Sequence, residues 1–400
     1  MKREDFPILE NKNLIYFDNA ATTLKPNCVI QAMNDYFCYY TSNIHRGSYD
    51  TAIVTDYLYD SARQVVQEFV HASSPREVVF TSGTTHSINL VVLGYMKYHL
   101  QAGDEVLLSK SEHASNILPW FRLAEEIGIC IRYIPLDDNY SLTYDAVLSA
   151  VTEKTKVISL AHVTNVIGDV RDISSIGKLC REKNILFHVD GAQSIPHMPI
   201  DFLRDSIDFL SFSGHKMCGP TGVGVLVAKE ELLKEMVPVF YGGGMNLSFD
   251  SQGHYLLKEV PVLFEAGTPA IAEVLGLKAA IEYLSSIGLD VIMQYEKELK
   301  AYFVSKLEDI EGIIFYNKDS DSGILSFNIE GVSSVDVAKY LNSFHICVRA
   351  GNHCSKMLKE DMVIPSTVRA SLYFYNTKEE IDLFVSALKN CQRVFKIISE

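Results

Sequence analysis

The 400-residue sequence lacks several features that would place it in a special class of protein. It has no run of about 18 uncharged apolar residues, the length that a membrane-spanning helix needs, and its start has no apolar stretch of signal-peptide length. Its 12 prolines and 23 glycines are too few for a disordered or collagen-like chain. We therefore expect a folded protein without a membrane partner, with two or three domains at about 150 residues each.

The sequence also has fewer basic than acidic residues, and its cysteines show no regular spacing. Lys and Arg total 36 against 50 Asp and Glu, and the net charge of -14 argues against a nucleic-acid partner. The eight cysteines form no CxxC pair and no regular framework, so a reducing, cytoplasmic location is expected. No HExxH motif is present and no GxGxxG follows an expected strand, so neither a metal nor a nicotinamide cofactor is predicted.

Short apolar runs that are typical of strands fill the middle of the chain. Seven occur between residues 78 and 228, and segments with helical spacing separate the first five, over residues 84–100, 113–127, 143–151 and 172–183. This alternation predicts an α/β fold with a mainly parallel sheet and helices on both faces. Only a short segment separates the last two runs, so that pair is expected to be antiparallel, which makes the seven-stranded sheet mixed.

The pattern changes after about residue 275. Two long helical segments between residues 273 and 307 are followed by two or three strands, IIFYN (313–317), GILSFNI (323–329) and CVRAG (347–351), and by a last helix over residues 378–394. We expect a large domain over residues 16–275 and a smaller α+β domain made of residues 1–15 and 276–400.

Polar residues follow the ends of the expected strands, where open α/β sheets bind their ligands. Thr84 and Thr85 open a helix after a glycine turn, and such a turn binds phosphate through its N–H groups, hydroxyls and helix dipole. On its own this turn is more typical of a plain threonine N-cap than of a phosphate site. The other polar residues at strand ends are His113, Asn165, Asp190, Gln193, Ser213, His215 and Lys216.

Pyridoxal 5'-phosphate is a cofactor that this set of side chains suits. Its aldehyde needs a lysine amine, its pyridinium nitrogen needs an anion, and its phosphate needs a cradle. Lys216, Asp190 and the Thr84-Thr85 turn offer these in the same order. The remaining contacts are assigned to four neighbours: ring stacking to His113, the ring hydroxyl to Gln193, and further phosphate contacts to Ser213 and His215.

Several segments together resemble the class V aminotransferase superfamily. VDGAQS (189–194) and SFSGHKMCGPTGVGVL (211–226) carry the likeness to the superfamily, and RAGNHC (349–354) is most similar to the group II, Suf-type cysteine desulfurases. The similarity runs nearly end to end. It departs from the family pattern at Asn352 and Ser355, where the family usually has His and Ala. It departs again at Ser82 and His86, where Arg and Glu are often found.

The resemblance implies a fold-type I transferase that forms a homodimer with its active sites near the subunit interface. Thr268, in FEAGTPA (264–270), would then reach the phosphate in the neighbouring subunit, and His45 would lie near the active-site entrance. Arg369 matches the carboxylate-binding segment of the family, with Asn165 in support and Arg349 near the cysteine loop. A guanidinium offers a carboxylate two parallel donors, although a structural ion pair is the other reading of Arg369.

The activity implied is that of a cysteine desulfurase acting on L-cysteine. Freed Lys216 would remove the α-proton, and Cys354 would take the sulfur as a persulfide and release alanine. His113 would manage the thiol proton. A small acceptor protein would collect the sulfur for iron-sulfur cluster assembly or a related pathway. Cys218 is the rival nucleophile, but its position in the family and its neighbour Met217 argue against it.

Two other readings stay open at this point. A related class V enzyme, such as a selenocysteine lyase, an aminotransferase or a kynureninase-like lyase, would leave Cys354 without a catalytic role. A chain that keeps this fold only to bind partners would release no alanine at all.

Overall fold

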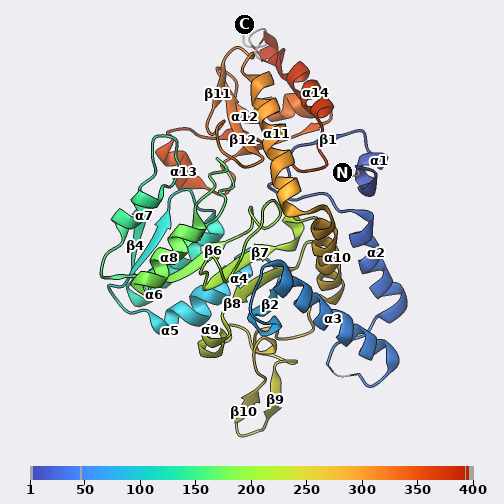
Figure 1. Cartoon of the computed structure of the whole chain (residues 1–400), viewed down its shortest axis with the longest axis vertical. Coiled ribbons are helices and arrows are strands. Elements are labelled where there is room, and N and C mark those ends of the chain that lie inside the picture. Colours follow the sequence, from blue (N-terminus) through green and yellow to red (C-terminus); the bar gives the residue numbers. More distant parts are fainter. Residues whose placement is uncertain (1–2, 46, 392, 396–400) are drawn as a thin grey trace.

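The computed structural model describes residues 3–45, 47–391 and 393–395 (Figure 1). Arg46, which follows the predicted site residue His45, and residue 392 in the predicted last helix lie outside the described residues. So do residues 1–2 and 396–400, at the ends of the predicted small domain.

A seven-stranded sheet forms the centre of the molecule, in the order β2-β8-β7-β6-β5-β3-β4. Strands β7, β6, β5, β3 and β4 run parallel to one another, whereas β8 is antiparallel to both of its neighbours, β7 and β2. The mixed sheet is thus confirmed, with the antiparallel pair where the short connection predicts it. Its strands are β2 (Val78–Thr81), β3 (Glu105–Ser109), β4 (Cys130–Ile134), β5 (Thr155–Ala161), β6 (Leu186–Asp190), β7 (Phe209–Ser213) and β8 (Gly224–Ala228).

Helices cover both faces of this sheet because successive side chains of each strand point to opposite sides. Val78 and Phe80 join one apolar core, whereas Val79 between them joins the other. The first core takes residues from α2 (Asn27–Asp35), α3 (Asp50–Phe69), α7 (Tyr144–Ala150), α8 (Ile173–Lys183) and α10 (Ile271–Ile287). The second takes residues from α4 (Thr84–Val91), α6 (Leu118–Ile127) and α9 (Glu230–Glu235).

Two predicted helices are interrupted. The segment expected over residues 84–100 is α4, then a π-helical turn over Val92–Met96, then α5 (Lys97–His99). The segment expected over residues 113–127 starts with a 3-10 turn, and α6 begins only at Leu118, one residue before Pro119. Proline suits the first turn of a helix because it lacks an N–H group, which explains the late start.

The C-terminal part is built on a four-stranded antiparallel sheet, in the order β11-β12-β15-β14. Phe303, Phe327 and Phe384 pack in its core. Strand β15 is absent from the predicted strands, and it is the one that carries Arg369. The elements here are β11 (Ile313–Phe315), β12 (Ile324–Ile329), β14 (Arg349–Gly351), β15 (Thr367–Ser371), α11 (Leu289–Leu307), α12 (Ser334–Asn342), α13 (Lys356–Asp361) and α14 (Lys378–Leu388).

The N-terminal segment joins this C-terminal part. After α1 (Pro7–Asn11), strand β1 (Ile15–Tyr16) pairs in parallel with β13 (Ile346–Cys347). The division into domains over 16–275 and over 1–15 with 276–400 stays a prediction.

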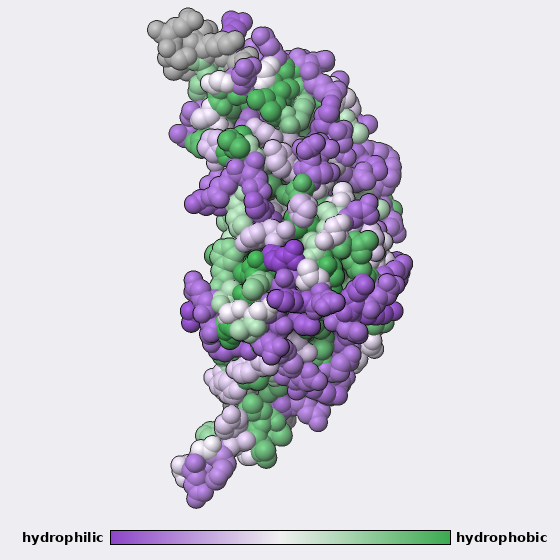
Figure 2. Space-filling view, turned by 90° about the vertical axis from the view of Figure 1, so that its left-hand side faces the viewer, coloured by the Kyte–Doolittle hydropathy of each residue, from purple (hydrophilic) through white to green (hydrophobic). Residues whose placement is uncertain are grey.

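A hairpin of β9 (Asn246–Phe249) and β10 (Tyr255–Leu257) projects from one end of the elongated molecule (Figures 1 and 2). Leu247, Phe249 and Leu256 on it are exposed. Within the described residues, no helix combines the length and the apolar character needed to cross a bilayer.

Gly177 on α8 offers a test of how closely this helix packs. A Cβ atom built at Gly177 would lie 1.9 Å from the main-chain oxygen of Asp205. We expect Gly177→Ala to lower the free energy of unfolding by about 1–3 kcal/mol, the usual cost of overpacking. Lys178→Ala, at an exposed position on the same helix, should change it by less than about 0.5 kcal/mol. Urea unfolding measures both, and equal stability of the two variants would contradict the close contact.

Candidate active site

A cavity of about 200 Å³ lies where the parallel strands of the large sheet end and β14 and β15 approach them. It gathers nearly all of the predicted site residues from distant parts of the chain. They are Thr84, Thr85, His113, Asn165, Asp190, Gln193, Ser213, His215, Lys216, Arg349, Cys354 and Arg369.

The predicted phosphate turn forms one wall of this cavity. The N–H of Thr84, at the start of α4, donates a hydrogen bond to Ser213 Oγ at 2.8 Å, and the Thr84 hydroxyl lies 2.6 Å from the same oxygen. Thr85 Oγ1 lies 2.7 Å from Ser115 Oγ. Gly83 precedes the helix with a φ of 151°, a conformation that glycine adopts easily. Hydroxyls and the positive end of a helix dipole therefore face one place, which suits an anion.

Lys216 lies on a short 3-10 turn directly after β7. Burial lowers its pKa from 10.5 to about 8, and the negative charge of Asp190 opposes that shift. The turn is held in place from outside, because the main-chain oxygen of His215 accepts hydrogen bonds from Thr23 N–H at 3.0 Å and from Lys25 Nζ at 2.9 Å. Near neutral pH a much larger share of the Lys216 amine is therefore neutral than in an ordinary lysine, and a nucleophile or base requires that neutral form.

Asp190 ends β6 and is buried. Burial raises its pKa to about 6, while the hydrogen bond that its Oδ1 accepts from Ala192 N–H, at 2.9 Å, favours the carboxylate. Gln193 follows closely and donates from Nε2 to the main-chain oxygen of Ala20 at 2.8 Å. Its Oε1 is buried and has no hydrogen-bond donor among the described residues.

His113 faces the cavity as a neutral ring with a fixed tautomer. Burial lowers the pKa of His113 to about 4, and the positive charge of Lys216 adds to this. Its Nδ1 accepts a hydrogen bond from the N–H of Ser115 at 3.1 Å, so the proton of the neutral ring is on Nε2. Its ring can therefore stack on an aromatic ligand and still donate from Nε2.

Arg369 both lines the cavity and makes an ion pair. Its Nη2 donates to Asp18 Oδ1 at 3.1 Å and its Nη1 to the main-chain oxygen of Asn165 at 2.8 Å. Its buried Nε has no acceptor among the described residues. Arg349 lies opposite Arg369 in the β14-β15 register. Both arginines thus line the cavity, and the carboxylate that pairs with Arg369 is Asp18, which sequence analysis did not find.

Cys354 stands in a strained loop at the mouth of the cavity. Its side chain is exposed, and both Cys354 and His353 have left-handed backbones, with φ of 59° and 53°. This conformation costs about 1–2 kcal/mol for each residue that has a Cβ. Cys218, by contrast, is buried, and burial raises its pKa to about 12, so it stays protonated at neutral pH. The geometry thus favours Cys354 over Cys218 as a reactive thiol.

His45 and Thr268 do not join this cavity. They line a second one of about 120 Å³, in which Asn43 Nδ2 donates to Thr268 Oγ1 at 3.3 Å. Their expected roles across a subunit interface therefore stay predictions.

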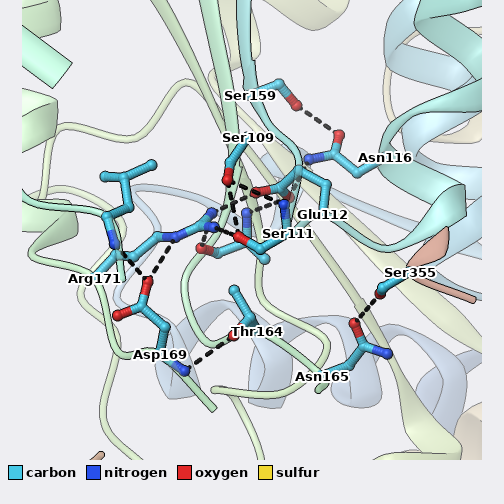
Figure 3. Close-up of polar contacts among 12 residues, drawn as sticks. Ser109, Ser111, Glu112, Asn116, Ser159, Thr164, Asn165, Asp169, Arg171 and Ser355 are labelled. Carbon is cyan, nitrogen blue, oxygen red and sulfur yellow. Dashed lines mark hydrogen bonds and ion pairs between the residues drawn. The ribbon is translucent and has the colours of Figure 1, made fainter. Parts of the chain in front are cut away.

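A buried polar network supports the cavity from beneath, and sequence analysis did not find it (Figure 3). Arg171 forms an ion pair with Glu112, the residue before His113, and both side chains are inaccessible to solvent. Arg171 also donates to the main-chain oxygen of Ala161 at 3.0 Å, while Glu112 accepts from the N–H of Ala161 at 2.7 Å. Ala161 is the cross-strand neighbour of Asp190, so this ion pair fixes the positions of His113 and Asp190 together.

The residues present fit pyridoxal 5'-phosphate. The unsatisfied Oε1 of Gln193 needs a donor from a ligand, and a buried amine, a buried carboxylate and a hydroxyl-lined helix start surround the same space. No group of three or more His, Cys, Asp or Glu side chains among the described residues is arranged to hold a metal ion. Fold and cavity together define an α/β enzyme built around this cofactor.

Comparison with known proteins assigns the chain to a family. The family described as Aminotransferase class-V matches residues 15–384, and the chain belongs to it. A probable cysteine desulfurase of Halalkalibacterium halodurans is 42% identical over 396 residues, which cover 98% of this chain and 97% of that protein. A probable cysteine desulfurase of Staphylococcus aureus is 40% identical over 398 residues, 98% of this chain and 96% of its own. The predicted family is confirmed.

Solved structures agree with this assignment. A cysteine desulfurase of Thermococcus onnurineus NA1 superposes with a TM-score of 0.93 at 36% identity, covering 97% of this chain and 96% of its own. The cysteine desulfurase CsdA of Escherichia coli gives a TM-score of 0.92 at 33% identity, covering 98% of both chains. The predicted fold-type I architecture is confirmed, and pyridoxal 5'-phosphate is the cofactor of this family.

The lowered pKa of Lys216 gives a prediction for the cofactor-free protein. An amine reacts with acetic anhydride only when it is neutral, so acetylation of Lys216 should rise with a midpoint near pH 8 and not near 10.5. Asp190→Asn removes a charge that favours the ammonium form, and the midpoint should then fall further. Mass spectrometry of the Lys216 peptide measures both, and a midpoint at the ordinary lysine value would contradict the burial argument.

Proposed function

We propose that this chain is a pyridoxal-phosphate-dependent cysteine desulfurase that converts L-cysteine to L-alanine and collects the sulfur on Cys354. The observation that carries the proposal is one cavity that joins the exposed thiol of Cys354 to the buried amine of Lys216. The names and high coverage of the relatives support the same activity.

The cofactor would be held by residues from the ends of four strands of the large sheet. Asp190 would keep an anion beside the pyridinium nitrogen, Gln193 Oε1 would accept a hydrogen bond from the ring hydroxyl, and His113 would stack on the ring. The phosphate would be bound at the start of α4, by Thr84, Thr85, Ser213 and His215.

The substrate carboxylate is bound by Arg369. Its unpaired Nε lies beside the cavity, and Asp18 and Asn165 already fix the orientation of its guanidinium. Arg349, opposite it on β14, adds positive charge. Asn165 supports the same carboxylate through its side-chain amide.

Proton transfer belongs to Lys216 and His113. When bound, the cofactor stabilises negative charge at Cα of the substrate by drawing electrons into its ring. Lys216, with its pKa near 8, removes the Cα proton in its neutral form. His113 keeps one proton on Nε2 and can donate it or exchange it with the substrate thiol.

Sulfur transfer then requires Cys354 as a thiolate. Its Sγ forms a bond to the sulfur of the substrate while the bond from that sulfur to Cβ breaks. The electron pair of the broken bond stays on the amino acid, which takes up protons and leaves as alanine. Cys354 is left as a persulfide, the group that an acceptor must collect.

The partners follow from this chemistry and from the second cavity. A homodimer would bring Thr268 and His45 to the site of the neighbouring subunit, and a small acceptor protein would take the persulfide sulfur from the exposed Cys354. Supply of iron-sulfur cluster assembly, or of a related sulfur-transfer pathway, in a reducing cytoplasm suits a chain whose reactive group is a free thiol.

A pair of cysteine variants tests the nucleophile. Cys354→Ala should lower alanine formation from L-cysteine at least 100-fold, because no thiolate remains to take the sulfur, while the visible absorbance of the bound cofactor persists. Cys218→Ala should keep alanine formation within about twofold, since that thiol is buried and protonated. Measuring alanine with a reductant present decides between them, and sustained activity of Cys354→Ala would show that Cys354 is incidental.

A further inference from the structure

The loop that carries Cys354 needs outside support, because His353 and Cys354 are both held in left-handed conformations. The N–H of Ala114, next to His113, donates to the main-chain oxygen of Cys354 at 2.8 Å. On its other side, the His353 ring contacts Thr367 through Nε2, at 3.1 Å from both the main-chain and the hydroxyl oxygen. Each support comes from an element that also shapes the cavity.

Asn165 is the junction between this loop and the substrate site. Its Nδ2 donates to the main-chain oxygen of His353 at 2.6 Å, and its Oδ1 accepts from the hydroxyl of Ser355 at 3.0 Å. Its own main-chain oxygen accepts from Arg369 at 2.8 Å. Asn165, Ser355 and Arg369 are all buried, so water does not replace these bonds readily.

The Ser355 hydroxyl fixes the orientation of the Asn165 side-chain amide. As Figure 3 shows, Ser355 points at the amide oxygen of Asn165. A donor on that oxygen fixes the orientation of the amide, and the NH₂ group then points at the His353 carbonyl. Without the hydroxyl, Oδ1 becomes a buried acceptor without a donor, and the amide can rotate away from the loop.

We propose that Ser355 is a positioning residue, which acts through Asn165 to hold Cys354 at the cavity mouth. The proposal rests on the proposed function, in which Cys354 is the nucleophile. Ser355 thereby links that nucleophile to Asn165, whose main-chain oxygen accepts from Arg369, so docking of the thiol depends on the side-chain amide of a residue next to the carboxylate site.

Hydrogen exchange tests the contact without any turnover. In the cofactor-loaded protein without cysteine, the Ala114 amide is protected only while the Cys354 carbonyl stays docked. Ser355→Ala should speed its exchange about tenfold, with core amides of β6 unchanged. Ser355→Thr keeps the hydroxyl and should restore protection. Ser366→Ala is the matched control, since the one hydrogen bond described for its hydroxyl joins it to Ser334 and not to the loop of Cys354.

A double-mutant cycle tests whether Ser355 acts through Asn165. In an Asn165→Ala background, Ser355→Ala should change Ala114 exchange less than twofold. In steady-state assays, Ser355→Ala alone should lower kcat about fivefold or more with KM for cysteine nearly unchanged, and Ser355→Thr should recover kcat.

Two results would overturn this proposal. Ala114 exchange in Ser355→Ala within twofold of the parent protein would show that the hydroxyl does not hold the loop. An undiminished effect of Ser355→Ala in the Asn165→Ala background would show that it does not act through Asn165. Neither result touches the proposed function, which fails separately if Cys354→Ala still forms alanine.

Discussion

The active site depends on a lysine amine and a carboxylate that the fold buries in the same cavity. Removal from water lowers the pKa of Lys216 and raises that of Asp190, so both groups are shifted toward neutrality. Their mutual attraction limits both shifts. Burial of both groups costs free energy. It also provides what the cofactor needs, a reactive amine for its aldehyde and an anion near its ring nitrogen. The large sheet provides the geometry, since β6 and β7 are neighbours and end at the same edge.

A second layer of buried polar groups keeps that geometry. The Glu112-Arg171 ion pair ties the residue before His113 to the end of β5, next to Asp190. Removal of either partner would leave an uncompensated buried charge, which usually costs several kcal/mol. Replacing the whole pair with apolar groups of similar volume, by contrast, is often neutral for stability, so the pair serves position more than stability. On the opposite side, Asn165 performs the equivalent task for Arg369 and for the loop of Cys354.

The central sheet could be predicted because its signals are local. Buried parallel strands give short apolar runs, and a connection too short for a helix reveals the antiparallel pair. The strands of the C-terminal part were harder to predict from the sequence. Strand β15, with the sequence TVRAS, contains the charged Arg369, and only pairing with the distant β12 and β14 makes it a buried strand.

The residues of the site also fall into two groups, those with a local signal in the sequence and those without one. Lys216, Asp190 and His113 each follow a recognisable strand, and the cavity contains all three. The supporting contacts leave no local signal: Arg171 lies 59 residues from Glu112, and Ser355 lies 190 residues from Asn165. Such pairs are created by the fold, so a single sequence does not display them. The role of Asp18 has no local signal either, because its partner Arg369 is 351 residues away.

The most direct test of this account is to locate the lysine that binds the cofactor. Lys25 is the natural competitor, because burial lowers its pKa to about 8 as well and its amine lies beside the main chain of His215. Borohydride reduction of the pyridoxal-phosphate-loaded protein, followed by peptide mapping, should place the cofactor on Lys216. Label on Lys25, or no label on Lys216 in fully loaded protein, would contradict the account.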